Sequence, residues 1–207
     1  PFWLSELRSV SVAFLNLGFG AEPFQSEVSQ ESLDLLQQVF RVVQRETYRH
    51  EGSINKFLLD DKGSTALIAF GLPPLCHNND PSRCISACLD IVVALKTIQY
   101  RNRCFMGIST GKVFCGPVGS NSRREYTVMG DVVNTAARLM QSSKQLYMQM
   151  AQTEVFCGYI LCESKTKSLA LKTYQSDLCF RPIGKLKLKG KVEELQVFQP
   201  GWLKSNA

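Results

Sequence analysis

Several patterns that would identify a class of protein at once are missing from this sequence. None of its eight cysteines forms a Cys-x-x-Cys pair, and only two histidines, His50 and His77, could complete a metal site. A structural zinc site is therefore not expected, because such sites are built from closely spaced Cys and His. Most of the cysteines stand in apolar runs, where a free thiol packs as a small hydrophobe. We expect a reducing intracellular compartment, in which disulfides are rare.

Long apolar runs and long basic runs are missing as well. No apolar run approaches the roughly 20 residues of a membrane-spanning helix. The net charge of +6 suits an anionic ligand, but no run of Lys and Arg exceeds two residues, which argues against nucleic acid as a partner. We expect a cytoplasmic protein with no membrane span.

No internal repeat and no low-complexity linker divides the 207 residues. The hydrophobic content of 44% and the charged content of 20% are those of an ordinary globular protein. We predict a single domain over residues 1–207 with a core at about residues 7–198. The start, Pro1-Phe2-Trp3, has neither an initiator Met nor the layout of a signal peptide, so we expect a fragment of a longer protein.

Strands and helices are predicted to alternate along the chain. Runs rich in β-branched and aromatic residues predict strands at residues 9–17, 54–59, 65–70, 105–109, 112–118 and 156–161, with a closing pair inside 180–198. Helices are predicted after Ser29, Asp80 and Asp131 as caps, and over residues 164–171. Residues 141–153 show no clean periodicity. The order β-α-β-β-α-β predicts an α/β (α+β) fold with a ferredoxin-like core and added strands.

The most informative stretch is residues 124–139, which read REYTVMGDVVNTAARL. A β-rich run breaks at Gly130, and an Ala-rich helical pattern follows it. Asn134 and Arg138 are four residues apart on this helix, so they project from one face. An amide and a guanidinium in this arrangement could hold a ribose and a phosphoryl group. The alternative is an amphipathic helix with two polar residues in water.

This stretch resembles the signature E-Y-T-V-x-G-D-x-V-N-x-A-A-R-L of the class III nucleotidyl cyclases. The resemblance implies that Asn134 positions the ribose and that Arg138 stabilises charge on the α-phosphate of the nucleotide. It covers residues 7–198. The segments Ile54-Asn55-Lys56 and Asp61-Lys62-Gly63 make the chain most similar to the second catalytic domain of the bicarbonate-responsive soluble adenylyl cyclases.

Two residues are candidates for reading the base. By the resemblance, Lys56 and Thr127 meet the adenine edge, where an ammonium donates to N1 and a hydroxyl accepts from the N6 amino group. Guanine presents the opposite groups, so this pair favours ATP over GTP. Lys62 in the predicted hairpin is a rival for the role of Lys56. A solvent-exposed lysine at a strand edge is the alternative for Lys56.

A third candidate contacts the phosphates. Lys185, Lys187 and Lys189 alternate with Leu, which predicts that they share one face of a strand. By the resemblance, Lys189 reaches the triphosphate, where a compact ammonium suits the pyrophosphate leaving group. Lysines also protect exposed edge strands from pairing with other chains, and that alternative stays open.

The carboxylates of a metal site are missing from their expected positions. Where the resemblance implies a metal-binding Asp, this chain has Asn16, whose neutral amide is a poor ligand for Mg²⁺. Asp60 and Asp61 lie near the second position but out of register with it. We therefore expect no metal on this chain. Two Mg²⁺ ions, for which Mn²⁺ can substitute, would be held by a partner domain.

By the resemblance, the chain is the metal-free half of an adenylyl cyclase pair, which converts ATP to cyclic AMP and pyrophosphate together with a second cyclase homology domain. The resemblance also implies bicarbonate as a regulator. The main alternative is a catalytically inactive cyclase-like domain that dimerises or regulates. A ferredoxin-like RNA binder has thinner support, because it needs exposed aromatics on its central strands and Tyr126 stands alone there.

Overall fold

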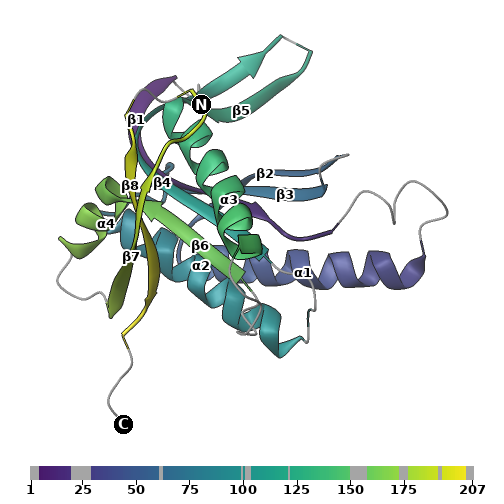
Figure 1. Cartoon of the computed structure of the whole chain (residues 1–207). Coiled ribbons are helices and arrows are strands. Elements are labelled where there is room, and N and C mark those ends of the chain that lie inside the picture. The colour runs from purple at the N-terminus through teal and green to yellow at the C-terminus, as the bar shows by residue number, and fades with distance from the viewer. Residues whose placement is uncertain are drawn as a thin grey trace.

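The computed structural model describes residues 5–19, 29–60, 63–98, 100, 104–120, 122–149, 158–172, 177–190 and 193–203 (Figure 1). The strands of this part of the chain are β1 (Glu6–Asn16), β2 (Ser53–Asp60), β3 (Gly63–Phe70), β4 (Cys104–Gly119), β5 (Arg124–Met129), β6 (Gly158–Glu163), β7 (Leu178–Leu186) and β8 (Leu195–Trp202). The helices are α1 (Gln30–Arg49), α2 (Asp80–Thr97), α3 (Asp131–Gln149) and α4 (Ser164–Leu171).

One sheet organises the domain. Its strand order is β2-β3-β1-β4-β6-β8-β7, and β5 pairs with β4 outside this path. β4 and β6 run parallel, whereas the other paired strands run antiparallel. The sequence β1-α1-β2-β3-α2-β4 and the neighbours β2-β3-β1-β4 form the ferredoxin-like core, so the predicted α/β fold with added strands is confirmed.

Helices cover both faces of the sheet. One core lies between the sheet and the helices α1 and α2, with Leu15 and Ile68 meeting Val43 and Ile85. The opposite face carries α3, which packs through Ala136 near its start and through residues such as Leu139 further along. The central strand β1 is buried on both faces because it lies between β3 and β4 under both helical layers.

β4 is one strand of 16 residues, so the prediction of two strands broken at Thr110-Gly111 is wrong. The pairing with β1 continues through the predicted break, with Ser11 opposite Thr110 and Val10 opposite Gly111. Gly111 does not form a turn but allows α3 to approach β4 closely. A Cβ on Gly111 would lie only 2.9 Å from Cγ2 of Val132 on α3. A glycine in a strand pattern often marks such an approach.

The helix starts agree with prediction to within one residue. Ser29 caps α1, and its side chain accepts a hydrogen bond from the Ser32 N–H, as predicted. Asp80 and Asp131 are the first residues of α2 and α3, so their prediction as caps is wrong. The Gly130 carbonyl accepts the first N–H bond of α3, and one carboxylate oxygen of Asp80 accepts from the His77 N–H in the preceding loop.

α3 continues to Gln149, through a stretch whose periodicity was uninformative. Its buried stripe there is Met140, Ser143 and Tyr147, of which Ser143 is polar and Tyr147 carries a hydroxyl. The Ser143 hydroxyl donates to the Met140 carbonyl at 2.7 Å, and the Tyr147 ring packs 5.7 Å from the ring of Phe105. Polar residues at buried positions hide the helical pattern from a hydrophobicity count. Residues 150–157 lie outside the described part.

The later elements shift only slightly from prediction. β6 begins and ends two residues after the predicted 156–161, and α4 has its predicted bounds. All seven cysteines that the structure describes are free thiols, and five of them are buried. Among the residues that the structure describes, no helix is both long enough and apolar enough to cross a membrane.

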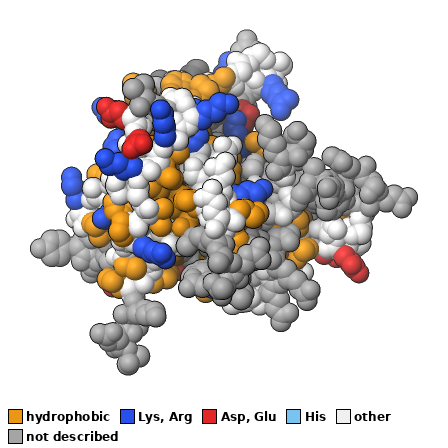
Figure 2. Space-filling model, in the orientation of Figure 1, with side chains coloured by type: hydrophobic (Ala, Val, Ile, Leu, Met, Phe, Trp, Pro, Cys, Tyr) orange, Lys and Arg blue, Asp and Glu red, His pale blue; other side chains and the backbone are white. Residues whose placement is uncertain are grey.

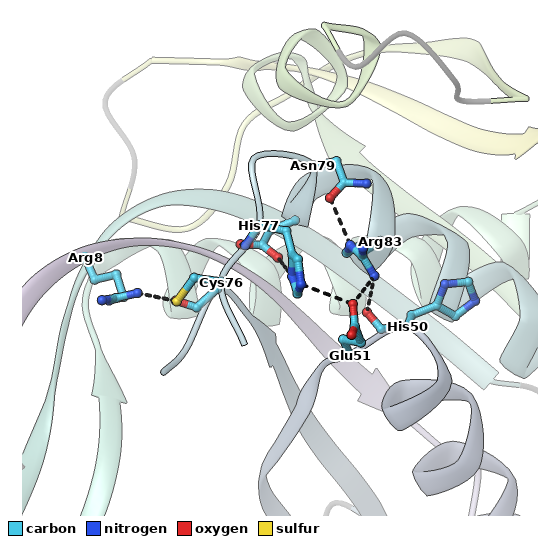
Figure 3. Close-up of polar contacts among 9 residues, drawn as sticks. Arg8, His50, Glu51, Cys76, His77, Asn79 and Arg83 are labelled. Atoms are coloured by element: carbon cyan, nitrogen blue, oxygen red, sulfur yellow. Dashed lines mark hydrogen bonds and ion pairs between the residues drawn. The ribbon is translucent and has the colours of Figure 1, made fainter. Parts of the chain in front are cut away.

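Polar contacts tie the loop after β3 to the rest of the domain (Figure 3). Arg8 of β1 donates to the Gly71 carbonyl at 3.3 Å and contacts the Cys76 thiol. At the other end of the loop, Glu51 pairs with His77 at 3.1 Å and with Arg83 of α2 at 2.7 Å. These contacts fix the loop between β1 and the end of α1, and they occupy a histidine that composition alone left available for a metal.

Candidate functional site

A cavity of about 190 Å³ opens on the face of the sheet that carries α3. It is mainly apolar, with three polar side chains among its lining residues: Phe14, Lys56, Leu58, Thr65, Leu67, Thr127, Val128, Met129 and Val133. These residues come from β1, β2, β3, β5 and the first turn of α3. A cavity of this size is smaller than the roughly 300–1,000 Å³ of sites for whole drug-sized ligands, so it suits one part of a ligand, such as a base.

Lys56 reaches the cavity because β2 contains a bulge. Ile54 pairs with Ile68, and Lys56 pairs with the adjacent residue of β3, Leu67. Asn55 is therefore an extra residue without a partner on β3. Ile54 packs on the α1 and α2 side of the sheet. In a regular strand Lys56 would share that face, since side chains repeat every two residues. The bulge places Lys56 on the α3 face instead.

Thr127 lines the same cavity from β5, 71 positions after Lys56 in the sequence. It is buried, and its hydroxyl has no hydrogen-bond partner among the residues that the structure describes. A hydroxyl without a partner inside a mainly apolar cavity is free to bond a ligand. The structure therefore brings the two predicted base-reading residues together. Lys62, the predicted rival, lies outside the described residues.

Glu125 is a site residue that the sequence analysis missed. Its carboxylate Oε1 lies 3.4 Å from Nζ of Lys56, and both side chains are partly exposed at the edge of the cavity. The signal was present in the strand periodicity: Glu125 and Thr127 are two apart on β5, so they share a face. The ion pair supplies a counter-charge that orients the ammonium of Lys56.

Asn134 and Arg138 follow on α3, directly after the cavity residue Val133. Asn134 is exposed and Arg138 is half-buried. The two are separated by about 6 Å along the helix, at 1.5 Å per residue. The cavity residue Val133, the amide of Asn134 and the guanidinium of Arg138 thus follow one another along the first part of α3.

The chain returns to Arg138 at the turn after β7. A Cβ placed on Gly190 would lie 3.3 Å from Nη2 of Arg138, so the guanidinium lies beside the backbone of this turn. Leu188 is buried in the core beneath α3, beside Leu139, and anchors the turn. Lys189 is exposed and adjoins Gly190. Arg138 therefore lies against the turn that contains Lys189.

Lys187 and Lys189 are not on a strand, and this part of the prediction is wrong. β7 ends at Leu186, where its pairing with Leu195 of β8 ends, and Lys189 and Gly190 form a turn. The alternation still holds for burial, since Leu188 is buried while Lys187 and Lys189 are exposed. Gly190 has a φ of +74°, which lets the chain turn back over α3.

The residues near Asn16 do not fit a divalent metal ion. The Oδ1 atom of Asn16 accepts a hydrogen bond from the Gly18 N–H at 2.9 Å, which ends β1 in a side-chain turn. Opposite it on β3 stands Thr65, and the adjacent Ser64 bonds the N–H of Leu17 through its carbonyl; both side chains are neutral. Magnesium prefers carboxylate oxygens. The side chains of Asp60 and Asp61 lie outside the described part, and within that part no three His, Cys, Asp or Glu side chains are grouped to hold a metal.

Solved structures of nucleotidyl cyclases share this fold. The adenylyl cyclase CyaB from P. aeruginosa matches with a TM-score of 0.78 at 24% identity, over 96% of each chain. The guanylyl cyclase Cya2 matches with a TM-score of 0.74 at 20% identity, over 95% of this chain and 93% of that one. The fold is thus that of a class III cyclase domain, and it is common to enzymes named for different bases.

The sequence also matches this family directly. Residues 4–199 match the family described as "Adenylate and Guanylate cyclase catalytic domain", and the chain belongs to it. Human adenylate cyclase type 10 is 30% identical over 164 residues, which is 79% of this chain. The chain spans only 9% of the length of that relative. The predicted resemblance to the class III cyclases, and to the soluble adenylyl cyclases among them, is confirmed.

Proposed function

We propose that this domain is the metal-free half of an adenylyl cyclase catalytic pair, which converts ATP to cyclic AMP and pyrophosphate at its interface with a metal-bearing cyclase domain. The observation that carries the proposal is the line of groups along α3. We assign the base to the cavity with Lys56 and Thr127. The ribose is assigned to Asn134, and the phosphates to Arg138 and the Lys189-Gly190 turn beside it.

Base choice rests on Lys56 and Thr127. Lys56 donates to N1 of adenine, and Thr127 accepts from the N6 amino group. Glu125 orients Lys56 through their ion pair at 3.4 Å. The apolar residues of the cavity, such as Leu67 and Val128, pack against the faces of the ring.

Charge stabilisation rests on Arg138. In cyclisation, the ribose 3′-oxygen forms a bond to the α-phosphorus while the bond to the pyrophosphate oxygen breaks. Negative charge builds on the α-phosphate oxygens, where the guanidinium of Arg138, braced by Gly190, donates hydrogen bonds. Asn134 holds the ribose in line, and Lys189 contacts the departing pyrophosphate.

A partner domain completes the site. The neutral surroundings of Asn16 do not suit a metal ion, so we assign the two Mg²⁺ ions, or Mn²⁺ in their place, to carboxylates of the partner. The rim of the cavity supports pairing as well: Leu58 and Met129 are 49% and 47% exposed, an apolar surface that a second domain would cover. Bicarbonate as a regulator of the pair and the cytoplasm as its location belong to the same proposal, on the resemblance of the sequence to the bicarbonate-responsive soluble adenylyl cyclases.

A second candidate is a catalytically inactive cyclase-like domain that dimerises or regulates. It is favoured by one observation, the use of the Asn16 side chain as a structural turn residue at a position where the resemblance implies a metal ligand. On the face shown in Figure 2, Lys and Arg side chains are interspersed with acidic and hydrophobic ones, so this face has no continuous basic surface that would favour an RNA-binding role.

The two candidates are separated by a mixing experiment. The 207-residue chain is assayed for cyclic AMP alone and together with a metal-bearing cyclase domain, in Mg²⁺ and in Mn²⁺. We expect no product from the chain alone and turnover from the mixture. In the mixture, Arg138→Ala should lower kcat on the order of 100-fold or more with a smaller change in KM, because the guanidinium acts on charge that develops in the transition state.

The control places the matching Arg→Ala change on the partner domain, where it should have little effect. A mixture that stays inactive supports the regulatory candidate. Metal-dependent turnover by the chain alone would contradict the division of roles, and would make Asp60 or Asp61 a metal ligand.

A further inference from the structure

Thr65 is the third polar residue of the cavity, and no role has been assigned to it. It lies on β3, opposite Leu58 of β2 and opposite Asn16 of β1. Paired residues share a face of a sheet, and Leu67, two positions along β3, also lines the cavity. Thr65 therefore stands on the floor of the cavity, one strand away from Lys56.

The hydroxyl of Thr65 is not used by the fold. No described residue bonds it, although its neighbours on both sides are engaged: the Ser64 hydroxyl accepts from the Phe19 N–H at 3.2 Å, and the Asn16 amide accepts from the Gly18 N–H. Threonine is a favourable strand residue, so its presence alone needs no ligand. A hydroxyl without a protein partner in a mainly apolar cavity, however, is a typical ligand-binding group.

Adenine has acceptor nitrogens that a second hydrogen-bond donor could contact. Adenine has three acceptor nitrogens, N1, N3 and N7, and Lys56 takes only N1 in the proposed function. Thr127 accepts from the N6 amino group, so it donates to none of them. A hydroxyl on the cavity floor can donate to one of the two remaining nitrogens.

We infer that Thr65 is a base-binding residue, whose hydroxyl donates a hydrogen bond to a second ring nitrogen of the purine, N3 or N7. This inference rests on the proposed function and deepens it. Because the contact is made equally in the substrate complex and the transition state, it affects KM and leaves kcat unchanged.

The test compares Thr65→Val, which keeps the shape and removes the hydroxyl, with Thr65→Ser, which keeps the hydroxyl. Both variants are assayed in the pair with a metal-bearing cyclase domain, using ATP, 3-deaza-ATP and 7-deaza-ATP. We expect Thr65→Val to raise KM for ATP about three- to tenfold, the range of one neutral hydrogen bond, while Thr65→Ser stays near the wild type. One of the two deaza analogues should show the same KM with wild type and Thr65→Val, which identifies the nitrogen.

Two results would overturn the inference: an unchanged KM for ATP in Thr65→Val, or an equal loss for ATP and both analogues. Thr65→Ala serves as a second variant if Thr65→Val changes the thermal unfolding midpoint. Failure of the proposed function gives a different result, because the wild-type pair would then make no cyclic AMP from ATP. In that case the proposed role of Thr65 would be contradicted as well.

Discussion

At the scale of single residues, the cavity combines an ammonium and two hydroxyls with apolar walls, and the carboxylate of Glu125 pairs with the ammonium. Lys56 and Glu125 neutralise one another at the cavity mouth, and Thr65 and Thr127 stand inside. An exposed ion pair of this kind adds little to stability, typically about 0–1 kcal/mol. In the proposed function, its role is to orient the ammonium that donates to the base.

The first prediction exchanges the donor and acceptor of the base-reading pair. Lys56→Glu combined with Thr127→Cys should weaken ATP use and allow some GTP turnover, because guanine presents N1–H and O6 where adenine presents N1 and N6–H. The measurement is kcat/KM for both nucleotides in the paired enzyme. Lys56→Met with Thr127→Val is the control, which should lose ATP use without gaining GTP. If the double exchange left ATP turnover intact, the base would bind elsewhere, with Lys62 the next residue to test.

Far from the cavity, Glu163 is a buried carboxyl in a chain of hydrogen bonds. Its Oε1 atom accepts from the Thr166 hydroxyl at 2.8 Å and from the Thr110 N–H at 3.2 Å, and the Thr110 hydroxyl bonds that of Ser11 at 2.9 Å. Burial raises the pKa of Glu163, and the hydrogen bonds and Lys165 oppose that effect without cancelling it. The network joins β1, β4, β6 and α4 on the face opposite the cavity.

This raised pKa makes stability depend on pH. The folded protein binds the proton of Glu163 more tightly than the unfolded chain does, so the contribution of this group is fully present below the ordinary value of 4.5 and is lost as pH rises through the raised pKa. Glu163→Gln removes the titration. We expect the free energy of unfolding of this variant, minus that of wild type, to be larger at pH 8 than at pH 4, which means that the variant is relatively more stable at pH 8; urea denaturation measures both. The exposed Glu193→Gln is the control, and a difference independent of pH would contradict the assignment.

At the scale of elements, the close contact between α3 and β4 positions the site. Gly107 lies where the helix crosses the strand, and a Cβ on it would come 2.1 Å from the Ala136 carbonyl oxygen and 2.3 Å from the Met140 nitrogen. Both atoms belong to the helix backbone, so no side chain can move aside. The same helix carries Asn134 and Arg138 toward the site, and its depth on the sheet therefore sets their position.

Gly107→Ala should push α3 away from the sheet and destabilise the domain by about 1–3 kcal/mol or more, the usual effect of overpacking. Urea denaturation measures the change. Gly201→Ala is the matched control, because its Cβ would meet only the Cys179 sulfur at 3.4 Å, an ordinary contact. A Gly107→Ala protein as stable as wild type would mean that the helix and the strand are not packed this closely.

At the scale of the whole molecule, the sheet order assembles the site from distant segments. Lys56 comes from the edge strand β2, Thr127 from β5, Arg138 from α3, and Lys189 from the turn after β7. Both edge strands carry a bulge, at Asn55 in β2 and at Ile183 in β7, where two residues oppose one on the partner strand. Bulges also protect edges from pairing with other chains. In β2 the same bulge turns a lysine into the cavity.

Much of the architecture could be predicted from local sequence. The hairpin of β2 and β3, the cap at Ser29 and the strand-to-helix break at Gly130 depend on interactions within a few residues, so composition and spacing indicate them directly. The signature also placed Asn134 and Arg138 on one helix face, because helix geometry is the same in every protein. Their roles in catalysis remain predictions.

The rest required the tertiary structure. The local sequence predicts two strands separated at Thr110-Gly111, because turn propensity depends on neighbouring residues only. In the structure, continuous pairing with β1 keeps β4 as one strand. The sequence analysis also placed Lys189 on a strand, because alternation cannot reveal where the partner strand ends. Plain alternation would also have put Lys56 on the buried face under α1, and only the extra residue at Asn55 reverses this. The contact of Arg138 with Gly190 joins positions 52 apart, and it exists because Leu188 is buried beneath α3, a long-range packing contact that no local pattern encodes.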